Sequence, residues 1–176
     1  MENFISLVSS KLQQAGYLPE PYSAPYGTHV LLYTRSARRV QLGFAKVEDH
    51  FLFVDWDRSD IRNIPALKAL YAHFSAFANQ RFKTPHALRT QIPNLALVAV
   101  SRAEFAPEIV SFAQSTSLEP WYGGETGQVI LFELERQQVI SLASLRSGRH
   151  PRPGALPLGH ASQVIRDACS QAFLLE

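Results

Sequence analysis

The segment LALVAV, from Leu95 to Val100, restricts the fold of this chain more than any other stretch of the sequence. All six of its residues are apolar, so both faces of a strand formed here need to be covered. A strand that is buried on both faces is typical of the middle of a sheet with helices on each side. The segment therefore predicts a central β-strand between two layers of helix.

Three strand-like segments come before it and are joined by very short connections. They run from His29 to Arg35, from Val40 to Glu48 and from His50 to Asp57, and only Asp49 lies between the second and the third. Connections this short allow only antiparallel neighbours, so we expect a three-stranded meander.

A helix is predicted between the meander and the central strand. Asn63 can cap it, Pro65 falls in its first turn, and a broad apolar stripe runs to about Gln80. A helical crossover of this kind makes the third meander strand and the central strand parallel if they are neighbours.

The fold class that follows is mixed α/β, with a central mixed sheet flanked by helices. Helical spacing also predicts a first helix near the N-terminus, a helix starting close to Pro107, and a last helix over 162–173 that Ser162 would cap. Strands are expected from Gln128 to Glu135 and from Val139 to Leu142. Three prolines and three glycines in 147–160 predict a loop. With 176 residues, the chain is expected to form a single domain.

Composition restricts the class of protein. The formal net charge is only +2, so any basic surface must be local. One cysteine, Cys169, excludes an intramolecular disulfide and is expected to be a core residue. The first residues, MENFISLVSSKLQQ, have the reverse of the charge order of a secretory signal. Together these features predict a soluble, cytoplasmic protein.

The segment HFLFVDWD, from His50 to Asp57, ends an apolar strand in two carboxylates. On an extended segment, Asp55 and Asp57 share a face, and with Glu48 they are candidate ligands for Mg²⁺ or Mn²⁺. In the simpler interpretation, the same acids form solvated pairs with Arg58 and Arg62 or cap the next helix.

The order of these elements resembles the restriction-endonuclease-like superfamily, the PD-(D/E)xK nucleases, over roughly residues 1–118. The resemblance implies an acid on the second meander strand and an acid-x-lysine on the third, which bind Mg²⁺ and orient a water. In this chain Asp57 stands two residues after Asp55, where the lysine would be. Lys46-Val47-Glu48 has the right residue types in reversed order on the second strand. The catalytic motif is thus degenerate or absent.

Basic residues fall into three clusters, which are candidates for contacting a nucleic-acid backbone. The candidate residues are Arg35, Arg38 and Arg39 in the first hairpin, Arg81, Lys83 and Arg89 after the long helix, and Arg149 and Arg152 in the proline-rich loop.

The leading hypothesis is a domain without catalytic activity or cofactor that binds a protein or nucleic-acid partner. The first alternative is a Mg²⁺- or Mn²⁺-dependent nuclease or phosphodiesterase in which Asp55 and Asp57 bind the metal and Lys46 lies near the scissile phosphate. The second is a scaffold or assembly factor, with a large exposed apolar patch or a homodimer contact through Tyr17, Tyr22 and Tyr26 of the first loop.

Overall fold

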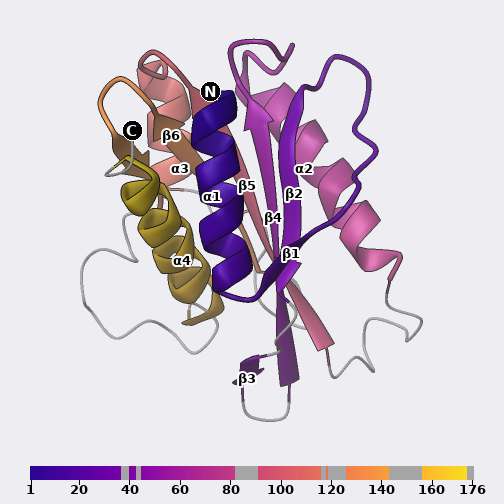
Figure 1. Ribbon diagram of the computed structural model, residues 1–176. Helices are drawn as coiled ribbons and strands as arrows, with labels where there is room; N and C mark the ends of the chain where they lie inside the picture. Colours follow the sequence, from indigo (N-terminus) through magenta and orange to yellow (C-terminus); the bar gives the residue numbers. More distant parts are fainter. Residues whose placement is uncertain are drawn as a thin grey trace.

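A computed structural model of the chain describes residues 1–36, 40–42, 45–81, 91–115, 118, 126–142 and 156–173. Within these residues, four strands follow the first helix, and helices then separate the later strands except the last two (Figure 1). Their bounds are α1 Glu2–Gln14, β1 Tyr17–Pro19, β2 Val30–Ser36, β3 Val40–Leu42, β4 Ala45–Asp55, α2 Ile64–Asn79, β5 Gln91–Ser101, α3 Pro107–Ser115, β6 Thr126–Glu133, β7 Gln138–Ile140 and α4 Leu156–Phe173.

The strands form one mixed sheet in the order β1-β2-β4-β5-β6-β7, and β3 pairs with β4 beside this path. β4, β5 and β6 are parallel neighbours in the middle of the sheet. The β1–β2, β2–β4, β3–β4 and β6–β7 pairs are antiparallel. The predicted fold class is confirmed, and the predicted LALVAV segment lies inside β5, with parallel strands on both sides.

The strand β4 differs from the prediction. It runs without a break from Ala45 to Asp55, so Asp49 is a strand residue and not the turn between two strands. β4 pairs in parallel with β5 from Lys46 opposite Gln91 to Asp55 opposite Val100. A carboxylate is stable at this position because both of its oxygens accept hydrogen bonds on the α1 side of the sheet.

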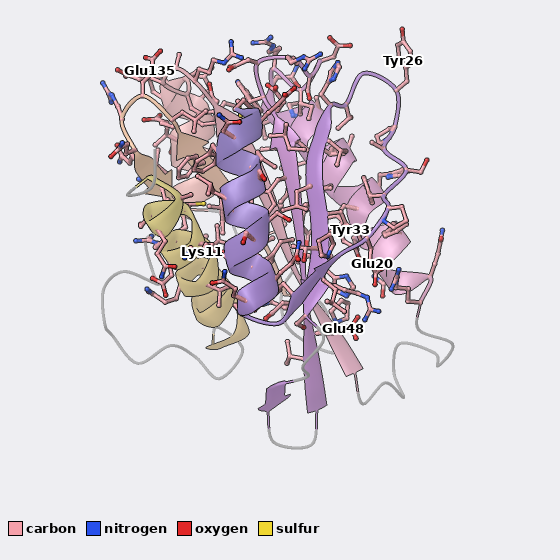
Figure 2. The ribbon with its side chains drawn as sticks, in the orientation of Figure 1. Lys11, Glu20, Tyr26, Tyr33, Glu48 and Glu135 are labelled. Atoms are coloured by element: carbon pink, nitrogen blue, oxygen red, sulfur yellow. The ribbon has the colours of Figure 1, made fainter. Side chains whose placement is uncertain are left out.

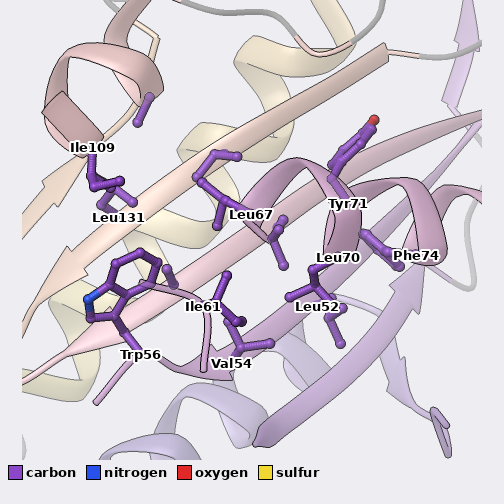
Figure 3. Packing of buried hydrophobic residues seen from close by; sticks show 14 of the residues in the cluster. Leu52, Val54, Trp56, Ile61, Leu67, Leu70, Tyr71, Phe74, Ile109 and Leu131 are labelled. Carbon is purple, nitrogen blue, oxygen red and sulfur yellow. The ribbon is translucent and has the colours of Figure 1, made fainter. Parts of the chain in front are cut away.

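Two helices cover each face of the sheet. α1 and α4 lie side by side in front of it in Figure 1, and α2 and α3 lie behind it. Successive strand residues point to opposite faces, so β4 divides its apolar side chains between two cores. Phe51 and Phe53 pack with Phe4 and Val8 of α1. On the other face, Leu52, Val54 and their neighbours pack under α2, as Figure 3 shows.

The helix boundaries follow local chemistry. The side chain of Asn63 accepts a hydrogen bond from the amide of Ala66 at 2.9 Å, which confirms the predicted cap of α2. α3 begins at Pro107, as predicted. α4 begins at Leu156, six residues before the predicted cap. Pro157 is compatible with this start, because backbone amides in the first turn of a helix have no hydrogen-bond partner within the helix, so the missing N–H of proline costs nothing. Ser162 therefore lies within the helix, and its Oγ donates to Gln128 Oε1 at 2.9 Å.

Candidate functional site

The two aspartates of the predicted metal site hold the backbone that follows β4. Asp55 is only 2% exposed, and its Oδ1 accepts a hydrogen bond from the amide of Arg58 at 3.1 Å. Asp57 Oδ1 accepts from Ser101 Oγ at 2.9 Å, and Oδ2 accepts from the amide of Arg102 at 2.9 Å. Asp57 thus ties the end of β4 to the end of β5, which is a structural role.

Glu48 lies far from these aspartates. It precedes Asp55 by seven residues in β4, and a strand rises about 3.3 Å per residue, so their Cα atoms are roughly 23 Å apart. An odd spacing also places the two side chains on opposite faces. Lys46 belongs to β4, but its side chain lies outside the described part of the chain. Among the described residues, the structure has no group of three or more His, Cys, Asp or Glu side chains that could hold a metal ion.

Glu48 instead belongs to a polar cluster on the α2 side of the sheet, close to the end of α2 and to β1. We call it the Arg35 cluster. Tyr33 and Arg35 of β2 share this face with Glu48 and His50 of β4, because Arg35 pairs with His50 in the antiparallel register. Figure 2 shows Glu20, Tyr33 and Glu48 in this region. The members of the cluster are Glu20, Tyr33, Arg35, Glu48, His50 and Arg81.

Arg35 bridges two carboxylates in this cluster. Its Nε lies 2.5 Å from Glu20 Oε1, and its Nη1 lies 3.3 Å from Glu48 Oε1. Burial by itself lowers the pKa of Arg35, but the hydrogen bond and charge of Glu20, followed by those of Glu48, raise that pKa above its ordinary value. Arg35 is therefore a permanent cation between two acids.

Arg81 reaches the same carboxylate from the end of α2. Its Nη2 donates to Glu20 Oε2, and its guanidinium lies 5.9 Å from the ring centroid of Phe77. The Arg81 side chain is 38% exposed and that of Arg35 is 28% exposed, so both side chains are partly accessible to solvent. Glu20 thus lies between two cations that are far apart in the sequence.

His50 is the buried member of the cluster. Its ring is 0% exposed, and its Nδ1 lies 2.8 Å from the Tyr33 hydroxyl. Nε2 lies 3.4 Å from Glu48 Oε1 but makes no hydrogen bond to any described residue. Burial first, and then the charges of Arg81 and Arg35, lower the pKa of His50 to about 3. The imidazole is therefore neutral at physiological pH.

The residue between Glu48 and His50 belongs to a separate network on the α1 side. Asp49 Oδ2 accepts from the Tyr17 hydroxyl at 2.8 Å, and Oδ1 accepts from Asn94 Nδ2 at 2.6 Å. The Asp49 amide donates to Ser36 Oγ at 3.0 Å. These bonds satisfy a carboxylate that is only 2% exposed, so Asp49 is a structural residue.

The structure places two of the predicted nucleic-acid-binding residues together, Arg35 and Arg81. The other candidates, which are Arg38, Arg39, Lys83, Arg89, Arg149 and Arg152, lie outside the described residues. Charge is also segregated along the chain. Residues 61–103, which include α2 and β5, carry six Lys or Arg and no Asp or Glu, whereas residues 104–135 carry six Glu and no Lys or Arg.

The tyrosines proposed for a dimer contact have different environments. Tyr17 is 4% exposed and stacks on Phe51, so it is a core residue and the prediction for it was wrong. Tyr22 packs against Phe77, and its hydroxyl lies 2.9 Å from His73 Nδ1. Tyr26 is fully exposed.

Sequence analysis missed Glu20 and His50. A signal for His50 was present, since Glu48-Asp49-His50 is an acid-x-base triplet directly before an apolar run. It was hidden because the strand was divided at Asp49. Glu20 had no local signal, because its partners come from β2 and the end of α2.

Comparisons of the chain with models of known protein families, with curated proteins and with solved structures find no match. Within the described residues, no helix combines the length and the apolar character needed to cross a membrane. What the chain does is therefore inferred from its own residues.

Proposed function

We propose that this chain is a non-catalytic domain of restriction-endonuclease-like topology that binds a nucleic-acid partner. The observation that carries the proposal is the position of Arg35 between Glu20 and Glu48. A guanidinium does not lose its positive charge by deprotonation in a protein. It therefore neutralises the carboxylates that a metal-dependent enzyme would need for a divalent cation.

The order of elements supports the resemblance in topology. A helix, α1, is followed by the antiparallel strands β1, β2 and β4, then by a crossover helix, a parallel strand and another helix. β4 is the third antiparallel strand of this set, and Glu48 and His50 stand on it two residues apart. The resemblance implies an acid and a lysine at that spacing.

The charges of the cluster differ from that pattern in two places. His50 takes the place of the lysine and is neutral, since its pKa is about 3. With β1, β2 and β4 counted as the three antiparallel strands, β2 is the second, on which the resemblance implies an acid, and the residue that β2 contributes to the cluster beside Glu48 is the cation Arg35. A cation beside the acid and a neutral histidine in place of the lysine support binding without metal-dependent cleavage.

The charge distribution supports a nucleic-acid partner. Arg35 and Arg81 converge on Glu20 from separate elements, and both side chains are partly exposed. The segment from 61 to 103, which supplies Arg81, contains no acid. Guanidinium groups bind phosphate oxygens through paired N–H donors, so two converging arginines are suited to the phosphate backbone even where the net charge of the whole chain is small.

Titration calorimetry with Mn²⁺ tests the absence of a catalytic metal site. We expect no stoichiometric heat for the native protein and the same baseline for Asp55→Asn, which removes a predicted ligand. In parallel, the native protein should bind a fluorescent DNA strand of about 20 nucleotides, longer than a typical single-strand site, at low salt and leave it intact in Mg²⁺ or Mn²⁺. Stoichiometric Mn²⁺ binding that is lost in Asp55→Asn, or metal-dependent cleavage, would overturn the non-catalytic part of the proposal.

A scaffold role is favoured by one specific observation. Tyr26 stands on a turn in which the Thr28 amide donates to the Pro25 carbonyl at 3.2 Å, and Gly27 supplies the positive φ of 79° that the turn requires. Tyr26 is fully exposed, and tyrosine is among the residues enriched at protein–protein contacts. If this contact forms a homodimer, light scattering should report a dimer for the native chain and a monomer for Tyr26→Ser.

A further inference from the structure

We infer that Arg35 and Arg81 form an anion-binding site for a backbone phosphate of nucleic acid, and that Glu20 fills this site as an internal competitor. The inference rests on the proposed function and adds the position of the phosphate and the residue that limits its binding. It starts from the contacts of Glu20, whose two carboxylate oxygens are each held by a different arginine.

The two arginines have more donors than Glu20 uses. An arginine carries about five N–H donors. Arg81 gives one to Glu20, and Arg35 gives one to Glu20 and one to Glu48. The remaining donors have no partner among the described residues, and both side chains are partly exposed. Two oxygens of a tetrahedral phosphate can accept the paired N–H donors of one planar guanidinium group.

Glu20 can give way without a change in the fold. Its backbone is fixed, because the Glu20 amide donates to the Tyr33 carbonyl at 3.0 Å at the end of β1. Its side chain borders a cleft of about 340 Å³ that Pro21, Tyr22 and Tyr33 also line. Rotation of the side chain would free the two guanidinium groups without moving this backbone, and Arg35 would keep its contact with Glu48.

A phosphate backbone has an advantage over a single carboxylate from another protein. A single carboxylate from another protein would make only the contacts that the Glu20 carboxylate already makes within the molecule. A nucleic acid carries many phosphates and releases condensed counterions when it binds, so its binding does not depend on one contact. This favours nucleic acid as the occupant.

The inference predicts opposite changes in DNA affinity when the charge of Glu20 or the charge of Arg81, its ion-pair partner, is removed. Glu20→Gln should tighten binding of the same labelled DNA strand by about threefold or more, because the competitor loses its charge. Arg81→Gln should weaken binding and reduce the slope of log K against log salt by about 1. Fluorescence anisotropy between low and physiological salt measures both quantities.

Matched controls separate this site from a general charge effect. Glu135 and Arg102 are exposed and lie at the other end of the sheet, beyond β6 and β5. We expect Glu135→Gln and Arg102→Gln to change the affinity by less than about twofold. A thermal melt of each variant confirms that it is folded, and calorimetry of Glu20→Gln with inorganic pyrophosphate distinguishes free phosphate from a nucleic-acid source.

The outcomes are distinct from those of the proposed function. The inference is overturned if Glu20→Gln binds DNA no better than Glu135→Gln does, or if it binds pyrophosphate and no DNA. If the native protein binds DNA and Glu20→Gln shows no gain, only this inference fails. If Glu20→Gln binds more tightly and the protein also cleaves DNA with Mn²⁺, this inference stands and the non-catalytic proposal fails.

Discussion

The hydroxyl of Tyr33 and the Nδ1 atom of His50 lie 2.8 Å apart on the α2 side of the sheet, where both residues are buried. This contact joins β2 to β4 next to the partly exposed ion pairs of Arg35 and Arg81. Tyr33 and His50 are the two neutral, buried members of the Arg35 cluster, so removing the hydroxyl should affect stability and leave the charges of the cluster unchanged.

We expect Tyr33→Phe to lower the free energy of unfolding by about 1–3 kcal/mol, because it leaves the buried Nδ1 of His50 without its partner. Tyr22→Phe is the matched control, since it removes a hydroxyl that meets His73 at an exposed position. Its cost should stay below about 1 kcal/mol. Urea unfolding of both variants measures the difference, and equal costs would contradict the role given to the Tyr33–His50 bond.

Stability should fall as the solution is acidified. The pKa of His50 is about 3 in the folded protein and 6.5 for an unperturbed histidine, so between these limits the unfolded chain binds more protons at this residue. The contribution of His50 is complete above pH 6.5 and is lost as the pH falls towards 3, by up to about 1.4 kcal/mol per pH unit. Urea unfolding at several pH values from about 7.5 down to about 5.5 should show this slope.

The comparison with His50→Asn isolates this effect from other titrating groups, because the variant should show a flatter dependence over the same range. In the native protein, the NMR signal of the His50 ring should not shift between about pH 7.5 and pH 5. A His50 ring that titrates near its ordinary pKa would contradict the prediction, even if the variant proved too unstable to study.

Asp57→Ala should cost about 1–2 kcal/mol of unfolding free energy, because it removes the acceptors for both Ser101 Oγ and the Arg102 amide. The control is Asp167→Ala, whose carboxylate accepts one exposed bond from Gln163. We expect a cost below about 0.5 kcal/mol for the control. If Asp57 instead served mainly as a metal ligand, its removal would leave stability nearly unchanged in the absence of metal.

Gly127 lies in β6 against the ring of Tyr71. A Cβ at this position would fall 1.6 Å from the Tyr71 hydroxyl oxygen and 2.4 Å from Cζ, so the buried ring would have to move. We expect Gly127→Ala to destabilise the protein by about 1–3 kcal/mol. The cost should shrink in a Tyr71→Leu background, and a double-mutant cycle with thermal or urea unfolding checks this coupling.

Much of the fold was accessible from sequence because local chemistry determines it. The apolar run from Leu95 to Val100 requires cover on both faces, and Asn63 followed by Pro65 marks a helix start that the structure confirms. Asp49 caused the main error. A carboxylate in an apolar run resembles a turn, and only the distant partners Tyr17 and Asn94 make it acceptable inside a strand.

The Arg35 cluster was harder to predict for a related reason. Its members are spread from residue 20 to residue 81, and their meeting depends on the register between β2 and β4 and on where α2 ends. Spacing along the chain shows only neighbours of one element. Arg35 and Arg81 were predicted as candidates from their charge, but their common partner Glu20 follows from tertiary structure alone.

The pairing of α1 with α4 has a consequence for synthesis on the ribosome. α2, α3 and the strands between them emerge in succession, so the core beneath them can assemble as the chain grows. The opposite side stays incomplete until residues 156–173 have left the exit tunnel, since α4 is the neighbour of α1, which precedes it by more than 140 residues. Until then Ile130 and Phe132 lack part of their cover, and the nascent chain at that stage should be the form that chaperones recognise.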